Sequence, residues 1–257
     1  MNYLTTQNTY RSPNLPVSRF AQNFPSLIFY AKMLLVVLKA SKLSKKGEYT
    51  GEKWVQSSLD IVKALESVGV PFEIENVAVH QKLGTPCVFV ANHMSILETF
   101  VLPCLIQPYR DVTFVVKESL ISYPFFKHVI MSRDPIVVGR VNPRQDLKDV
   151  LEEGQKRLSV NVSIIVFPQT TRSVYFDTTK FNTLGVKLAK RAGVPVIPIA
   201  LKTDAWGLGR RLKDFGKINP KIPVRICFGD PLAIKDSGRE EHNKIVAFIS
   251  GKLNDWH

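Results

Sequence analysis

The sequence predicts an α/β protein in which a mixed sheet is layered by helices and preceded by an N-terminal two-helix appendage. From residue 72 onward, short apolar runs alternate with segments of helical periodicity, a pattern typical of strands and helices in one layered sheet. Ahead of that region lie two helical patterns, and the first is apolar on nearly every side. With 257 residues and 45% apolar side chains, the chain is long enough for one large domain, or for a domain with an appendage.

The N-terminal part begins with a polar stretch, residues 1–23, which predicts a loose leader. Residues 24–38 then form an apolar helical segment interrupted only by Lys32, and at about 15 residues it is shorter than the ~20 that span a bilayer. Four lysines follow at once: Lys39, Lys42, Lys45 and Lys46. This pattern is typical of a helix that inserts into one leaflet and places its lysines on anionic head groups. A buried core helix and a cleaved signal peptide are the alternatives.

A second helix is expected over residues 51–68, where valine, leucine and isoleucine form a stripe at helical spacing. Gly69 and Pro71 end it. We therefore expect a leader and a two-helix membrane-association motif in residues 1–69, and an α/β domain in residues 70–257.

The α/β domain is expected to contain strands and helices in alternation. The strands are expected where short apolar runs lie between turn residues: 72–79, 86–91, 111–116, 135–138, 162–166, 195–201 and 222–228. The helices are expected where apolar residues recur at helical spacing: 95–107, 119–131, 144–159, 181–192 and 238–253.

The charge and the cysteines limit the partners and the compartment. A net charge of +13 favours an anionic partner, such as nucleic acid, acidic lipid or a phosphorylated small molecule. The best nucleic-acid patch, residues 210–217, lacks a recognition motif, so we expect no nucleic-acid partner. The three cysteines, Cys87, Cys104 and Cys227, are scattered and form no C-x-x-C pair, which predicts a reducing compartment and no metal site.

The most informative segment is residues 92–98, directly after the expected strand 86–91. It places His93 and Glu98 five positions apart. On one continuous helix such residues point about 140° from each other, so they meet only if His93 lies in the turn before the helix and Glu98 in its first turn. The histidine would then be a general base whose tautomer the carboxylate fixes. The alternative is a capping box, in which Ser95 caps the helix and Glu98 reaches back to its backbone.

A second polar segment, residues 167–173, follows the expected strand 162–166. It reads Phe-Pro-Gln-Thr-Thr-Arg-Ser, a turn that is rich in hydroxyl groups and contains Arg172. A base with a carboxylate partner, followed by such a turn, suits the transfer of a group to an alcohol that lies beside a phosphate.

These segments occur in the order found in the glycerolipid acyltransferase family typified by lysophosphatidic acid acyltransferase, which the chain resembles over residues 85–201. That family has a histidine followed, after four residues, by an acidic residue. It also has a lysine, a basic residue after an apolar strand, a Phe-Pro block with an arginine, and an apolar strand containing proline. The matching positions are His93 with Glu98, Lys117, Arg140, residues 167–173 and residues 194–200.

The resemblance implies an O-acyltransferase. His93 would take the proton of an acceptor hydroxyl, which attacks the thioester of acyl-CoA or acyl carrier protein, and Glu98 would orient His93. The acyl carrier is a co-substrate, and no cofactor is implied. Three basic residues would hold phosphate: Lys117, Arg140 and Arg172. The remainder of the Phe-Pro block would contact the acceptor: Gln169, Thr170, Thr171 and Ser173.

The resemblance also implies partners and a location. The acceptor would be lysophosphatidic acid, converted to phosphatidic acid in phospholipid biosynthesis. The enzyme would lie on an anionic lipid surface, as a monotopic protein at the cytoplasmic face of the cell membrane. The two-helix appendage is similar to that of bacterial members.

Three positions depart from the family pattern. Glu98 stands where aspartate is usual and adds a methylene group. Gln169 removes a carboxylate from the Phe-Pro block, and Thr170 replaces a glycine. The acceptor could therefore be another lysolipid. A relative that binds acyl lipids without catalysis, and a basic nucleic-acid-binding protein, are the non-enzymatic alternatives.

Overall fold

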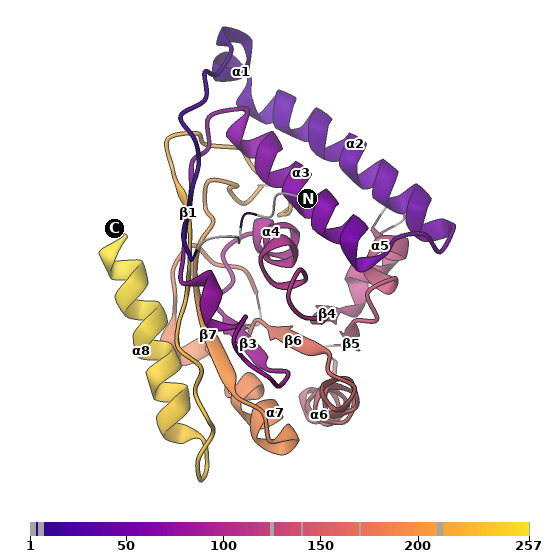
Figure 1. Ribbon diagram of the computed structural model, residues 1–257, viewed down its shortest axis with the longest axis vertical. Coiled ribbons are helices and arrows are strands. Elements are labelled where there is room, and N and C mark those ends of the chain that lie inside the picture. The colour runs from indigo at the N-terminus through magenta and orange to yellow at the C-terminus, as the bar shows by residue number, and fades with distance from the viewer. Residues whose placement is uncertain are drawn as a thin grey trace.

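The computed structural model describes residues 4, 8–123, 126–139, 141–169, 171–209 and 213–256. Within these ranges, eight strands form one sheet in the order β1-β2-β8-β7-β3-β6-β4-β5 (Figure 1). The strands are β1 (Tyr10–Arg11), β2 (Phe72–Glu75), β3 (Val88–Ala91), β4 (Val112–Lys117), β5 (Ile136–Val138), β6 (Ser163–Val166), β7 (Val196–Lys202) and β8 (Val224–Phe228).

The sheet is mixed, as predicted. The five strands β7, β3, β6, β4 and β5 run parallel to one another. β8 pairs antiparallel with β7 and parallel with β2, and β1 closes the far edge antiparallel to β2. The parallel half places the carboxyl ends of neighbouring strands at one edge of the sheet, where open α/β sheets bind their ligands.

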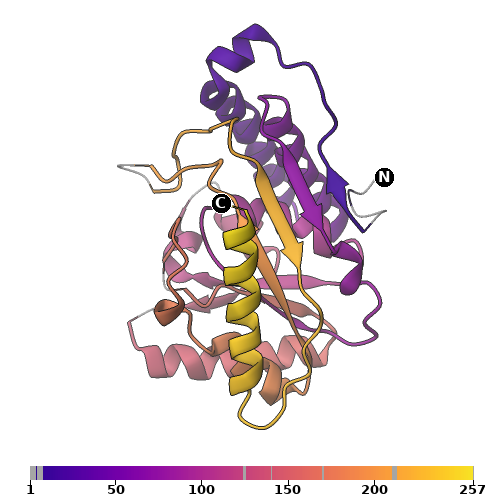
Figure 2. The same ribbon diagram turned by 90° about the vertical axis from the view of Figure 1, so that its left-hand side faces the viewer.

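Helices cover both faces of this sheet (Figures 1 and 2). The helices are α1 (Arg19–Asn23), α2 (Pro25–Lys45), α3 (Gly51–Glu66), α4 (Leu97–Ile106), α5 (Lys127–Met131), α6 (Pro143–Ser159), α7 (Leu184–Ala192) and α8 (Arg239–Asp255). Short 3₁₀ turns lie at η1 (Val77–Val79), η2 (Glu118–Ser122) and η3 (Thr178–Lys180). α2, α3 and α4 pack on one face, and α6, α7 and α8 on the other.

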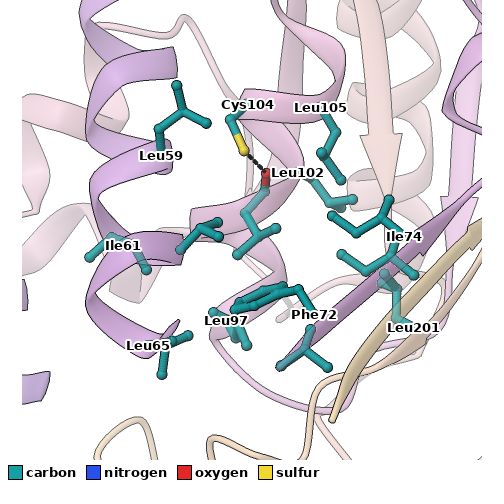
Figure 3. Close-up of a cluster of buried hydrophobic side chains, with 14 of the residues drawn as sticks. Leu59, Ile61, Leu65, Phe72, Ile74, Leu97, Leu102, Cys104, Leu105 and Leu201 are labelled. Atoms are coloured by element: carbon teal, nitrogen blue, oxygen red, sulfur yellow. Dashed lines mark hydrogen bonds between the residues drawn. The ribbon is translucent and has the colours of Figure 1, made fainter. Parts of the chain in front are cut away.

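Alternate residues of the central strands fill cores on opposite faces. Phe89 and Ile165 join the core beneath α3 and α4, whereas Val88 and Ile164 join the core beneath α6 and α7. This is why the central strands are apolar on both sides. Figure 3 shows part of the first core, where side chains of α3 and α4 meet Phe72 and other residues of β2 and β7.

Two predicted elements are wrong in detail. The expected helix 119–131 is divided into η2 and α5, because Tyr123 is extended, with ψ of 119°, ahead of a proline that disfavours the helical conformation. The expected strand 72–79 ends at Glu75, because Asn76 adopts a left-handed conformation with φ of 59° before η1.

Part of the expected loose leader is regular: β1 and α1 lie within residues 8–23, and residues 12–17 between them have no regular structure. Tyr10 pairs with Ile74 at the sheet edge, and the hydroxyl of Tyr10 donates to Glu66 of α3 over 2.6 Å. The hydroxyl of Ser12 donates to the same carboxylate, at 2.5 Å. A polar stretch therefore becomes ordered, because its hydroxyl groups find an acceptor on α3.

The first helix of the predicted appendage is half inside the core and half outside it. In α2, Phe29, Met33 and Val37 are buried in the core that also contains α3 and the sheet. Leucines on its other face are exposed by 42–68%: Leu27, Leu34, Leu35 and Leu38. Among the described helices, none has the length and apolarity needed to cross a bilayer. Membrane insertion, and the division at residue 69, stay predictions.

Candidate active site

The segments expected to act together follow two neighbouring parallel strands, and a further residue of the site follows a third. β3 lies between β7 and β6, so the segments that leave the carboxyl ends of these strands emerge side by side. Residues 92–98 follow β3, residues 167–173 follow β6, and Thr203 follows β7.

Asn92 marks the point where the chain leaves the sheet. Its side-chain amide donates to the carbonyl of Leu201 over 2.7 Å and accepts from the N–H of Leu201 over 2.8 Å. The side chain thus continues the ladder between β3 and β7 by one more pair of hydrogen bonds. The backbone of residue 93 is thereby free to turn away, which places His93 in the loop before α4.

His93 and Glu98 form the predicted pair. His93 Nδ1 lies 2.6 Å from Glu98 Oε2, and the glutamate side chain is fully buried. Since a carboxylate only accepts, Nδ1 carries the proton and donates it, which leaves Nε2 free as a base. The geometry is that of a histidine oriented for general-base chemistry.

The capping interpretation holds for Glu98 but not for Ser95. The residue at the N-cap of α4 is Ile96, which makes no side-chain cap, whereas the Glu98 carboxylate does reach back to the backbone. Oε2 binds His93, while Oε1 accepts from the N–H groups of Met94 and Ser95, at 2.8 and 2.9 Å. Ser95 Oγ accepts from the N–H of Leu97 at 3.1 Å. One side chain therefore starts the helix and orients the base. The additional methylene of glutamate is accommodated in this reach toward both groups.

A phenyl ring fixes the plane of the imidazole. The rings of His93 and Phe167 stack with centroids 4.3 Å apart and planes 15° from parallel. Phe167, in turn, lies parallel to Phe114 of β4, with centroids 6.2 Å apart. Because the ring of His93 is held on one face by this stack and at Nδ1 by Glu98, its free nitrogen has a defined direction.

The Phe-Pro segment holds the backbone of His93 from both sides. Gln169 Oε1 accepts from the N–H of His93 at 2.7 Å, and the N–H of Ser173 donates to its carbonyl at 3.0 Å. The buried Gln169 thus keeps an acceptor oxygen where the family usually has a carboxylate. Ser173 Oγ caps its own turn by accepting from the N–H of Tyr175, and Thr171 is exposed. Thr170 lies outside the described residues.

The predicted phosphate ligands are brought together only in part. Arg172 and His93 line the same cavity, and the Arg172 guanidinium forms an ion pair there with Asp214. Lys117 is exposed at the end of β4 and does not line that cavity. Arg140 lies outside the described residues.

The cavity beside His93 is apolar and measures about 160 Å³. Its walls come from α2, α3, α4, β4 and α5, with side chains such as Val37, Phe114 and Phe126. Arg133 also lines it, with its guanidinium 5.5 Å from the ring centre of Trp54. Burial lowers the pKa of Arg133 from its ordinary value, but an arginine remains charged at neutral pH. These walls suit an apolar ligand group.

Three contributors to the site were missed from the sequence. Asn92 and Thr203 are polar residues directly after neighbouring strands, and that position was the signal available for them. Asp214 lies 42 positions beyond its partner Arg172 in an irregular segment, so no local pattern indicates the pair.

Comparisons with known proteins identify the family of the chain. A family model described as "Acyltransferase" matches residues 71–202. The chain is 35% identical over 115 residues to a 1-acyl-sn-glycerol-3-phosphate acyltransferase of Pseudomonas aeruginosa, which covers 45% of this chain and 44% of that protein. It is 26% identical over 184 residues to a protein of the same name from Cocos nucifera. That alignment covers 71% of this chain and 56% of the Cocos nucifera protein. The aligned parts thus span about half the length of these two relatives.

The fold is also similar to a solved structure. The 1-acyl-sn-glycerophosphate (LPA) acyltransferase PlsC from Thermotoga maritima superposes with a TM-score of 0.68. The match covers 92% of this chain and 96% of that one, at 18% sequence identity. At this identity the likeness concerns the arrangement of the sheet and its helices.

Proposed function

Because the chain belongs to the acyltransferase family, we propose that it is a membrane-associated O-acyltransferase acting on a lysophospholipid. It transfers a fatty acyl group from acyl-CoA or acyl carrier protein to the free hydroxyl of lysophosphatidic acid, and phosphatidic acid is the product. One observation carries the proposal: the buried Glu98 holds His93 beside Arg172 on the wall of an apolar cavity.

The pair supplies the base for the reaction. His93 Nε2 accepts the proton of the acceptor hydroxyl while that oxygen attacks the thioester carbonyl. The new ester bond forms as the carbon–sulfur bond breaks, and the proton passes from the imidazolium to the leaving thiolate. Glu98 stabilises the imidazolium that exists between these steps. The acceptor oxygen is the nucleophile, so no acyl-enzyme is required.

The acceptor is positioned through its phosphate. Arg172 offers a planar guanidinium that can hold phosphate oxygens in bidentate fashion. In the structure this group is paired with Asp214, so a bound phosphate would compete with that carboxylate for the guanidinium. Lys117 and Arg140 remain proposed further ligands, and Thr171 and Ser173 remain proposed acceptor contacts.

The acyl chain would occupy the apolar cavity, and the same helix would contact both the chain and the membrane. α2 lines the cavity through Val36, Val37 and Ala40. Its opposite face carries the exposed leucines, and all four lysines after residue 38 are exposed. This arrangement supports a monotopic position on an anionic lipid surface, with the cytoplasmic face of the cell membrane as the proposed location.

Replacing exposed leucines of α2 is expected to weaken membrane binding without unfolding the protein. Leu27→Gln and Leu35→Gln remove side chains that are 63% and 68% exposed, so their loss leaves the core intact. Each change should lower partitioning to anionic vesicles about 10-fold, since burying one leucine contributes about 1.5–3 kcal/mol. Vesicle co-sedimentation, with thermal melts alongside, measures this.

Val160→Gln is the matched control, because Val160 is 70% exposed but follows α6 on the other face of the sheet. It should leave vesicle binding unchanged. Replacing Lys39 and Lys42 by glutamine should weaken binding to anionic vesicles alone, by about 1 kcal/mol per lysine at low salt. Equal binding by the leucine variants and the wild type would remove the basis for membrane insertion of α2.

The departures in the Phe-Pro segment are expected to affect the choice of acceptor. The double change Gln169→Glu with Thr170→Gly restores the usual family residues, and a glutamate keeps the oxygen that binds the N–H of His93. We expect the ratio of kcat/KM for lysophosphatidic acid to that for other lysolipids to change on the order of 10-fold. An unaltered ratio in a folded double variant would mean that these residues do not select the head group.

The wild-type protein tests the proposed function in the same assay. Labelled acyl-CoA and acyl carrier protein are each supplied with a panel of lysolipids, and the labelled products are separated. Transfer to lysophosphatidic acid is the expected result. No transfer from either donor to any lysolipid, by a folded protein on vesicles, would contradict the proposal.

A further inference from the structure

Thr203 connects the end of β7 to the buried carboxylate of the proposed active site. Its hydroxyl donates to Glu98 Oε1 over 2.5 Å, and the residue is completely buried. Ser95 Oγ donates in turn to Thr203 Oγ1 over 3.0 Å. The oxygen of Thr203 thus accepts a hydrogen bond from Ser95, and its proton is donated to Glu98.

This contact completes a set of three donors on one carboxylate oxygen. Glu98 Oε1 accepts hydrogen bonds from the N–H groups of Met94 and Ser95 and from the hydroxyl of Thr203. A carboxylate without water favours its neutral form unless hydrogen-bond donors stabilise the charge. Two of the donors are backbone groups fixed by the turn, so Thr203 is the donor that a side-chain substitution removes.

We propose that Thr203 is a positioning residue for the proposed acyl transfer, acting on His93 through Glu98. Its hydroxyl stabilises the Glu98 charge independently of the imidazole. Without that donor, the carboxylate depends more strongly on the proton of an imidazolium, and His93 releases that proton only at higher pH. The inference rests on the proposed function of the His93–Glu98 pair.

Other charged and titratable groups lie near the pair. Tyr49, Tyr123 and Arg133 line the same cavity as His93, and the Arg133 guanidinium donates to the backbone carbonyl of Tyr49. Arg172 and Asp214 form an ion pair on the cavity wall, and Lys202 Nζ lies 3.0 Å from Asp204 in the segment that contains Thr203. In the described parts of β3 and α4, Glu98 is the one charged residue. A change at Thr203 therefore acts on the balance between Glu98 and His93.

The test is the pH dependence of kcat/KM for Thr203→Val and Thr203→Ser. Valine keeps the shape of threonine and removes the donor, whereas serine keeps the donor. We expect the acid limb of the valine profile to move about one unit to higher pH, so that the rate on that limb falls about 10-fold. The rate should return toward the wild-type value at alkaline pH, with the acceptor KM changed less than twofold. The serine profile should follow the wild type.

Ser163→Ala is the matched control for the loss of a buried hydroxyl. Ser163 begins β6 at the opposite end of the sheet, where its Oγ accepts from the N–H of Cys87. Its loss should lower Tm while the pH profile keeps its shape. If the valine variant does not fold, Thr203→Ala removes the same donor and carries the comparison.

Each outcome separates the inference from the proposed function. Wild-type turnover with an unmoved acid limb in the valine variant would overturn the role of Thr203. An equal loss at every pH, or a serine variant as impaired as valine, would assign Thr203 to structure alone and also overturn it. Absence of transfer by the wild type would instead contradict the proposed function.

Discussion

Replacing Glu98 by glutamine is expected to lower kcat for acyl transfer by about 10²- to 10⁴-fold while Tm changes little. Glutamine keeps a carbonyl oxygen for the N–H groups of Met94 and Ser95 and for Thr203, so the cap on α4 is retained. Its amide then faces His93 Nδ1 with a donor in place of an acceptor. The imidazole must adopt the tautomer with the proton on Nε2, and that nitrogen can no longer act as a base.

Aspartate provides the control for this change. Glu98→Asp keeps the charge but is one methylene shorter, so it cannot bind His93 and both N–H groups in the same geometry. We expect partial activity together with a lower Tm. Steady-state kinetics and thermal melts of both variants separate orientation of the base from capping of the helix. A glutamine variant with a near-normal rate would reduce Glu98 to a helix cap.

Replacing Arg172 by alanine is expected to raise the acceptor KM about 100-fold, because the charge-assisted bonds to phosphate are lost and Asp214 is left without its partner. Arg172→Lys should recover only part of this loss, since an ammonium group lacks the bidentate fork. The donor KM should stay close to the wild-type value. Initial rates with varied lysophosphatidic acid at a fixed donor concentration measure both constants.

The ion pair with Asp214 requires its own control. Alanine at position 172 leaves the Asp214 carboxylate on the cavity wall without its ion-pair partner. That unpaired charge would destabilise the fold and repel phosphate. The double variant Arg172→Ala with Asp214→Asn removes that charge as well. If Arg172 binds phosphate, the double variant regains Tm but keeps a raised acceptor KM. Recovery of the acceptor KM to the wild-type value would show that Arg172 serves only to neutralise Asp214.

The part of the site that lies within one short segment could be predicted from the sequence. The spacing of His93 and Glu98 left two interpretations. In the structure one oxygen of Glu98 binds His93 and the other binds the backbone N–H of Ser95, although Ile96 and not Ser95 is the N-cap of α4. The segments after β3 and β6 were expected to act together, and the bonds of Gln169 and Ser173 to the His93 backbone show that they meet.

Features that depend on distant contacts could not be predicted. β1 is two residues long and exists because Tyr10 pairs with Ile74, far along the chain. The residues that line the cavity are spread along the sequence from Val36 in α2 to Phe215. No local periodicity in the sequence indicates that they lie together. The apolar pattern of α2 could not distinguish a buried core helix from a helix that inserts into a membrane. Both faces of α2 are apolar, but one lies in the core and the other is exposed.

The most direct measurement of the central claim is acyl transfer by His93→Ala beside the wild type, at saturating donor and lysophosphatidic acid. His93 supplies the base, so the alanine variant should lose at least as much in kcat as Glu98→Gln. Adding Glu98→Gln to it should make little further difference, since groups that act as one unit are not additive. A folded His93→Ala protein that transfers acyl groups at a rate near the wild-type value would contradict the account.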